Sequence, residues 1–521
     1  MALSPGTRLG PYEVTAHSGM GGMGRVVLGA VILLAILVAA VAMLVPLTSG
    51  RARKAVVDEL SERLNGEVQL DSLSVGLLPL PHATGSGLSV RFQGRWDVPP
   101  LITIDEFTVR AGLFGLLRHH VGAVALEGLT ITIPPKRPDA GGAVGDAIDG
   151  SWVIDRLESS DTTLSILSGE PDRDPKVWRI HELRMRDVGN RSMPFQAVLA
   201  NAVPPGQIDV NGNFGPWASG DPGATPLDGA FTFADADLSV FKGIAGILSA
   251  KGTFGGSLSR VEVHGETDTP EFVVQAGGHP VHLRTTYHAI VDGLNGNTLL
   301  QPVDARFNDT RIIARGGVVD SNPGAPGREV QLDVTVEEGR LEDVLLFAVR
   351  SDPPLRGALE LQAKMVLPPG DRDVAQKLEL DGSFTLTDAA FASRAVTRKI
   401  AELSERGRGE LDGDNAPVSS DFAGRFTLGN GQLAIPAVSF RVPGAVVRMT
   451  GTYGIADEAI DFKGSLFTDV KVSEMTSGWK SFLLKLVDPL FNRDGGGAEI
   501  PIQVSGTRSA PSFGLDKGRV F

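Results

Sequence analysis

The residues near the start of the chain whose types and spacing best suit chemistry are glycines. Gly19, Gly21 and Gly24 follow the spacing G-x-G-x-x-G, and Val26 stands two residues further on. Glycines at this spacing let a backbone loop approach phosphate oxygens closely, because no Cβ is in the way. This stretch therefore raises the question of nucleotide binding.

Residues 1–26 resemble the glycine-rich start of bacterial Ser/Thr protein kinases. Such a kinase also needs a lysine on the next strand to hold the ATP phosphates, an H-R-D motif and a D-F-G motif. The first lysine here is Lys54, which lies beyond a long apolar run, and neither motif follows. We therefore expect residues 1–25 to be a vestigial cytoplasmic leader that binds no ATP, and we expect no cofactor.

Other residue types that carry chemistry form no defined site. The chain has no cysteine, which excludes disulfides, thiolate metal sites and cysteine nucleophiles. His279, His282 and His288 are close in sequence, but no H-E-x-x-H motif or paired acidic ligand accompanies them, and G-x-S-x-G is absent. We predict no metal site, no catalytic residues and no enzyme activity. The alternatives are a metal site at these histidines and an enzyme of the cell envelope.

Residues 26–45 read VVLGAVILLAILVAAVAMLV and carry no charged side chain. About 20 apolar residues in a helix span the roughly 30 Å hydrocarbon core of a bilayer. The run is longer than a signal-peptide core, so we predict a retained transmembrane helix, with a cleaved signal peptide as the alternative. The basic residues after the run, Arg51, Arg53 and Lys54, would by charge alone place the large domain in the cytoplasm.

Most of the remaining chain alternates between apolar and polar residues. Hydrophobic residues make up 42% and charged residues 21%, as in globular proteins, and the net charge of −13 argues against nucleic acid as a partner. Alternation with a period of two predicts half-buried antiparallel strands. The clearest segments are 329–339 and 357–367. We predict that they share one apolar face, made of Val330, Leu332, Val334, Val336, Leu359, Leu361, Ala363 and Met365.

Helices are expected to be few. Apolar spacing predicts one at 51–64, with Val56, Val57, Leu60 and Leu64 on one side and Gly66 as its stop. Further short helices are expected at 113–119, 238–249, 341–349, 394–406 and 472–487. Many amphipathic strands with few helices to cover them must close into barrels, pack as sandwiches, or form a long curled sheet whose apolar side holds a ligand.

Two parts of the chain resemble the AsmA-like family. The segments VGLLPLPHATGSGLSV and LLRHHVGAVALEGLTITI match its N-terminal pattern through Leu78, Pro79, Pro81, Gly87, Leu88, Leu116, Val121, Leu126, Gly128 and Ile131. The C-terminal hallmark, a strand ending in G-T-Y, matches Gly451, Thr452 and Tyr453. The resemblance implies a mainly β fold, in which an N-terminal transmembrane helix precedes a long curled antiparallel β-sheet (a groove or β-taco) with a few short helices.

The expected organisation has five parts. They are the leader at 1–25, the transmembrane helix at 26–45, an AsmA-like N-terminal region at 51–137, a central β-groove at 151–380 and an AsmA-like C-terminal region at 381–521. The family's relation to TamB, YhdP and bridge-like lipid-transfer proteins implies that the eight apolar residues named above line a lipid groove.

The resemblance also implies a single-pass inner-membrane protein whose large domain is periplasmic, against the count of basic residues. Its function would be to hold or transfer lipid during outer-membrane assembly. The implied partners are phospholipid or another acyl lipid, the inner membrane and outer-membrane assembly proteins, with no nucleic acid. The alternative is an envelope scaffold, or an assembly factor for outer-membrane proteins, that carries no lipid.

Overall fold

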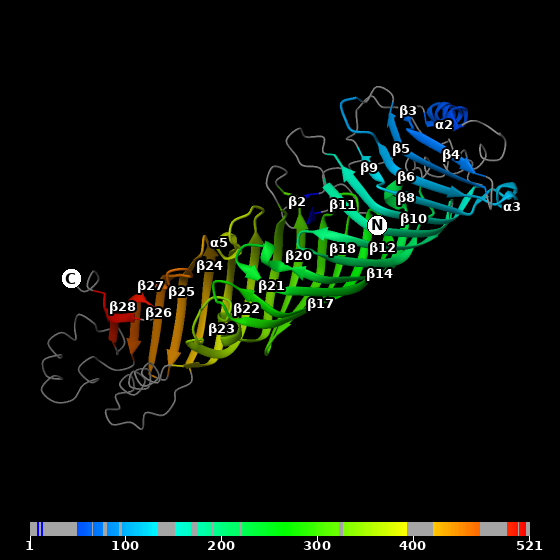
Figure 1. The fold of residues 1–521 in the computed structure, drawn as a ribbon. Coiled ribbons are helices and arrows are strands. Elements are labelled where there is room, and N and C mark those ends of the chain that lie inside the picture. Colours follow the sequence, from blue (N-terminus) through cyan, green and yellow to red (C-terminus); the bar gives the residue numbers. More distant parts are fainter. Residues whose placement is uncertain are drawn as a thin grey trace, which may run out of the picture. The chain divides into compact units, whose positions relative to one another are not determined.

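The fold is mainly β, with most strands in one large mixed sheet and few helices (Figure 1). It comes from a computed structural model, which describes residues 8–9, 12–13, 49–64, 66–76, 81–92, 96–133, 152–167, 176–189, 191–218, 221–321, 327–392, 420–442, 444–468, 498–508 and 510–516. The chain divides into two compact units. The first comprises Met1–Asp237, Leu248–Thr267 and His288–Leu299; the second comprises Leu238–Ile247, Asp268–Tyr287 and Leu300–Phe521.

The glycine spacing at 19–26 and the apolar run at 26–45 lie outside the described residues. Before them in the sequence, two short strands, β1 (Arg8–Leu9) and β2 (Tyr12–Glu13), pair with each other in antiparallel fashion. Within the part of the chain that the structure describes, no helix is long and apolar enough to cross a membrane.

The first unit has a closed hydrophobic core beneath helix α2 (Ser49–Leu64). Ala52, Val56, Leu60 and Leu64 recur every four residues, so they share one helix face, and each is at most 3% exposed. They pack against apolar side chains of the strands that follow. The helix predicted at 51–64 is confirmed.

The strands that follow α2 and lie wholly in this unit pair mostly with their neighbours in the chain. They are β3 (Gly66–Gln69), β4 (Ser72–Gly76), β5 (His82–Phe92), β6 (Ile102–Arg110), β7 (His120–Val121), β8 (Ala123–Glu127), β9 (Thr130–Ile133), β10 (Val153–Ile166), β11 (Lys176–Val188), β12 (Met193–Ala202), β13 (Pro205–Phe214) and β14 (Pro226–Asp237). A short 3₁₀ turn, η2 (Pro222–Ala224), precedes β14.

The alternation of residues predicts antiparallel strands throughout, but the sheet also contains parallel pairs. Strand β10 runs parallel to β7, β8 and β9 and antiparallel to β11. A parallel pair needs a crossover of about a dozen residues or more, and the segment 134–152 between β9 and β10 is long enough to supply it. Local alternation cannot distinguish the two directions, because it reports only which face each side chain takes.

Two glycines of the AsmA-like pattern, Gly87 and Gly128, have the same local geometry. Both have φ of +66°, and a Cβ at either would lie 2.1 Å from a carboxylate oxygen, of Asp71 and of Asp105 respectively. A left-handed backbone beside a close side chain admits only glycine without strain. The glycines are therefore required by the fold at these two points.

Strand β15 (Ile244–Ala245) lies in the second unit. The next four strands contribute segments to both units: β16 (Ile247–Ser257), β17 (Arg260–Val274), β18 (Pro280–Val291) and β19 (Thr298–Phe307). The second unit continues with β20 (Thr310–Val319), β21 (Glu329–Arg340), β22 (Leu355–Leu367), β23 (Glu379–Phe391), β24 (Ser420–Gly429), β25 (Gln432–Val442), β26 (Ala445–Gly454), β27 (Ala459–Thr468), β28 (Ala498–Thr507) and β29 (Ala510–Leu515). From β20 to β29 each strand pairs antiparallel with the next one along the chain.

The helices agree with the predictions in part. Helices α3 (Leu113–Leu117) and α4 (Leu341–Leu345) lie where they were expected, while 394–406 and 472–487 are outside the described residues. The helix predicted at 238–249 is wrong: η3 (Leu238–Val240), a single 3₁₀ turn, is followed by β15 and β16. Gly243 and Gly246, with φ of +96° and +140°, interrupt any helical run there.

Helix α5 (Val374–Lys377) was not predicted. Its N-cap is Asp373, whose side chain accepts a hydrogen bond of 2.8 Å from the backbone N–H of Ala375. So short a helix leaves no periodic apolar pattern, and only its cap residue marks it in the sequence.

Candidate functional site

The eight residues predicted to share an apolar face lie on β21 and β22, which pair directly. Val330 faces Leu367, Leu332 faces Met365 and Val334 faces Ala363 across the two strands. Paired residues of antiparallel strands point to the same side of a sheet. A bulge between Val336 and Gly339 then brings Leu359 opposite Gly339 without moving it to the other face. The register thus brings all eight together on one face.

Along β22, buried or half-buried apolar residues alternate with exposed polar ones. Leu359 and Ala363 are buried and Leu361 and Met365 are half-buried, whereas Glu360, Gln362 and Lys364 between them are exposed. On β21 the apolar residues are half-buried except Val336, which is 3% exposed. The face is therefore apolar and only partly covered.

The apolar face continues across the second unit as a cross-strand row, which we call the middle row. Each member is the registered partner of the next, from β21 to β29: Val336, Leu361, Phe384, Gly424, Val438, Met449, Gly464, Ile502 and Leu515. Neighbouring strands are about 4.8 Å apart, so the row extends for about 40 Å. From Leu361 to Ile502 its members are half-buried.

A second row lies beside the middle row and is closed to solvent for much of its length. Leu359, Leu386, Phe422, Phe440, Val447, Leu466 and Ile500 form this closed row. Leu359 and Leu386 are 2% and 1% exposed, and Leu341 and Val344 of α4 pack against them. One border of the apolar face is thus a true core, while the middle row is more open.

A third row lies on the other side of the middle row and is separated from it by the row of Val334, Ala363, Gly382 and Phe426. Leu332, Met365, Leu380, Leu428, Leu433, Tyr453 and Ile460 are successive partners in it. Tyr453, the tyrosine of the G-T-Y motif, carries the one hydroxyl among these seven, and burial raises the pKa of its phenol. The three rows together make a broad apolar face.

Phenylalanine rings provide much of this surface between β23 and β25. The ring of Phe422 lies 4.6 Å from that of Phe440, and Phe384 lies 6.3 Å from Phe426, between ring centroids. The Phe384 ring also covers Gly424, where an added Cβ would meet it at 3.0 Å. An aromatic ring over a glycine of the adjacent strand supplies the contact that glycine lacks.

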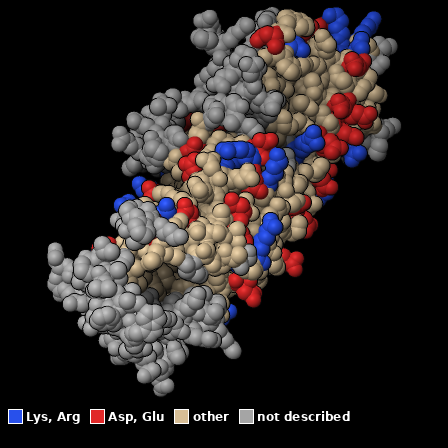
Figure 2. All heavy atoms as spheres, turned by 90° about the vertical axis from the view of Figure 1, so that its left-hand side faces the viewer, with Lys and Arg blue, Asp and Glu red and all other residues tan. Residues whose placement is uncertain are grey.

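The opposite face of the same strands is polar. Asp333 pairs with Lys364, which pairs with Asp381, and all three side chains are exposed. On the side of the molecule shown in Figure 2, acidic and basic side chains are interspersed among uncharged ones. The polar face of these strands interacts with water, so the two faces of the sheet have different chemistry.

A hollow of about 870 Å³ lies on strands β23 to β27. Thr385, Ala423, Ser439, Arg448 and Ser465, which line it, are successive cross-strand partners on the polar face. Its lining also includes Phe384, Gly424, Val438, Met449 and Gly464 of the middle row, whose positions alternate with these polar ones along each strand. Sequence reasoning missed it, because the polar positions of the strands were interpreted only as solvated.

The histidines are not gathered into one site. The Nε2 atom of His282 lies 2.7 Å from Asp268, and this hydrogen bond is the main reason that the carboxyl pKa of Asp268 is lowered. The ring of His288 instead stacks on His264, with centroids 4.3 Å apart. Among the described residues, no group of three or more His, Cys, Asp or Glu side chains has the arrangement of a metal site.

The geometry thus defines a mainly β protein whose second unit has an apolar and a polar face. Comparison of the chain with protein-family models, with curated proteins and with solved structures finds no match. The proposals below therefore depend on the residues themselves and on the resemblance described above.

Proposed function

We propose that this protein is an AsmA-like lipid-handling protein of the cell envelope, which holds or transfers acyl lipid along the apolar face of a curled β-sheet. The observation that carries the proposal is the middle row. It runs across nine successive strands, from the buried Val336 on β21 to the exposed Leu515 on β29, and its members from Leu361 to Ile502 are half-buried, with polar side chains on the reverse face.

The energetics of an acyl chain fit such a face. Transferring one CH₂ group from water to an apolar surface is worth about 0.8 kcal/mol, so a 16-carbon chain gains on the order of 12 kcal/mol. A row about 40 Å long exceeds the roughly 15 Å that one leaflet contributes to a 30 Å hydrocarbon core. Dispersion contacts are non-directional, so a chain could move along the row without losing a specific bond.

The contrast between the units supports a ligand on this face. Around α2 in the first unit, apolar residues form a closed core; Val56 and Leu60, for example, are at most 1% exposed. In the second unit, Leu361, Phe384 and Met449 remain half-buried on a continuous apolar face. Large apolar surfaces in contact with water usually mark binding sites. A bound acyl chain would cover these side chains.

The cellular setting in this proposal follows from the apolar run at 26–45 and from the AsmA-like resemblance. The run would anchor the chain in the inner membrane, with residues 1–25 in the cytoplasm and the large domain in the periplasm. Partners would be phospholipid or another acyl lipid and, as in the resembled family, proteins of outer-membrane assembly. No catalytic residue enters the proposal.

Mass spectrometry of lipids retained by the full chain, extracted from membranes in a mild detergent, tests the proposal. We expect phospholipid at a stoichiometry of at least one per chain, which persists after exchange into lipid-free detergent. A chain that retains no lipid in this experiment would refute lipid carriage and favour the scaffold function.

A further inference from the structure

A cluster of arginines lies on the polar face of β10 and β11 in the first unit. Arg156 of β10 is the registered partner of Arg186 of β11, and Glu158 is the partner of Arg184. Partners across an antiparallel pair have Cβ atoms about 5 Å apart. The side chains of Arg156 and Arg186 therefore leave the backbone at directly opposite positions. The protein as a whole has a net charge of −13.

These arginines differ in whether an opposite charge lies beside them. Arg184 forms an ion pair of 3.1 Å with Glu182 and also stands opposite Glu158. Arg156 and Arg186 face each other, and like charges in directly opposite positions destabilise a strand pair. Both arginines of this unfavourable pair lie on an exposed face.

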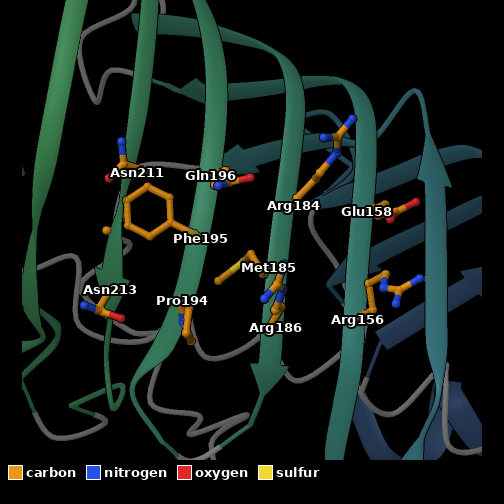
Figure 3. Close-up of a pocket in the computed structure, with 11 residues that line it drawn as sticks. Arg156, Glu158, Arg184, Met185, Arg186, Pro194, Phe195, Gln196, Asn211 and Asn213 are labelled. Atoms are coloured by element: carbon orange, nitrogen blue, oxygen red, sulfur yellow. The ribbon is translucent and has the colours of Figure 1, made fainter.

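A hollow of about 380 Å³ lies over these residues and over the neighbouring strands β12 and β13. Gln196, Asn211 and Asn213 add amide groups to its lining. Figure 3 shows Arg156, Glu158, Arg184 and Gln196 projecting to one side of their strands, whereas Met185 and Phe195 project to the other. The lining therefore combines the guanidinium and amide groups of the polar face with one carboxylate, that of Glu158, which stands opposite Arg184, and Met185, Pro194 and Phe195 also line it.

We propose that this hollow, which we call the arginine site, binds the phosphate group of a small anion. Each guanidinium presents a planar fork of N–H donors that matches two oxygens of a phosphate, and an arginine pair can bind one anion from both sides. The bound anion would offset the repulsion between Arg156 and Arg186. The side-chain amides of Gln196, Asn211 and Asn213 would form hydrogen bonds with the rest of the bound anion.

The size of the hollow favours a small ligand over a macromolecular surface. A volume of about 380 Å³ is within the usual range of about 300–1,000 Å³ for small-molecule sites. The phosphate could belong to a free compound or to a lipid headgroup, because both present the same oxygens. The site is independent of the apolar rows, so it can be real whether or not the protein carries acyl chains.

Isothermal titration calorimetry on the full chain in neutral detergent tests the site. One titrant is pyrophosphate, and the other is dihexanoyl phosphatidylglycerol below its micelle concentration. The variants are Arg156→Gln and Arg186→Gln, with Arg179→Gln as the matched control. Arg179 is an exposed residue of β11 on the same face, opposite Ala200, and it does not line the hollow.

We expect Arg156→Gln and Arg186→Gln each to raise Kd by about tenfold or more, and Arg179→Gln by less than about twofold. Without ligand, the melting temperatures of the first two variants should equal or exceed that of the wild type, because the repulsion is relieved. Arg186→Lys, which keeps the charge and loses the fork, should bind with intermediate affinity.

The two titrants separate the sources of the phosphate. Arginine-dependent binding of pyrophosphate indicates a free phosphate compound, and arginine-dependent binding of the lipid alone indicates a headgroup. Equal affinity of the wild type and both site variants would overturn the proposal. It would also fail if Arg179→Gln weakened binding as much as they do, since the effect would then be general charge attraction.

Discussion

Placing a charge in the middle row tests whether this row is an open lipid-binding face or part of a closed core. Leu361 is half-buried between its registered partners Val336 and Phe384. Leu361→Asp puts a carboxylate on the apolar face, whereas Gln362→Asp puts the same group on the exposed polar face one residue away. Leu386→Asp supplies the closed-core reference, because Leu386 is only 1% exposed.

The expected magnitudes differ between these positions. Burying a leucine fully is worth about 1.5–3 kcal/mol, so the half-buried Leu361 side chain should lose about 1–2 kcal/mol. Its carboxylate can still reach water, which limits the desolvation penalty. For a unit of this size, 1–2 kcal/mol lowers the melting temperature by about 2–8 °C. At Leu386 the charge would be buried without a partner, and the loss should exceed about 4 kcal/mol.

The assay combines a thermal melt with the lipid content of each purified variant, measured by mass spectrometry. Leu361→Asp should fold and retain less than about half of the wild-type lipid, because a charge in the row repels an acyl chain. Gln362→Asp should match the wild type in both measurements. Leu386→Asp should fail to fold.

Two results would refute this reasoning in different ways. If Leu361→Asp folds and retains its full lipid load, this part of the face does not contact lipid. If it unfolds as completely as Leu386→Asp, the middle row belongs to a closed core, and an envelope scaffold becomes the better hypothesis.

Three further predictions address charge, backbone and topology. Hydrogen bonding from Arg311 holds the pKa of Asp304 below its usual value, so this ion pair stabilises the fold above about pH 4 and loses that effect as the pH falls through the lowered pKa. Urea unfolding at pH 6 and pH 3 should show a smaller loss of stability in acid for Arg311→Gln than for the wild type. An unchanged loss would contradict the assignment. Gly128→Ala should cost about 1–3 kcal/mol in thermal melts, because φ is +66° and its Cβ would strike Asp105, whereas a Cβ at Gly112 meets nothing within 4 Å and Gly112→Ala should be nearly neutral. Equal effects of the two alanines would be evidence against backbone strain. A reporter enzyme fused after the last residue should be active only in the periplasm, and cytoplasmic activity would disprove the proposed topology.

Much of the local structure could be predicted from the order of residues. Alternation at 329–339 and 357–367 predicted two strands with a common apolar face, and the register of β21 with β22 places their apolar residues together. The recurrence of Val56, Leu60 and Leu64 predicted helix α2. These signals are strong because side-chain direction repeats every two residues in a strand and every 3.6 in a helix, so neighbours in sequence are sufficient to define a face.

Other features depended on which strands meet. The parallel pairing of β10 with β8 has no local signature, and the opposition of Arg156 and Arg186 joins residues thirty positions apart. The segment 238–249 was predicted as a helix because a short apolar run suits either structure, and its glycines decided against it. Whether an apolar face is half-buried or closed likewise depends on what packs above it, as α4 does over Leu359 but not along the whole middle row. Sequence alone determined the faces of the strands, and only the tertiary structure decided which faces meet, because burial and register come from contacts between residues far apart in the chain.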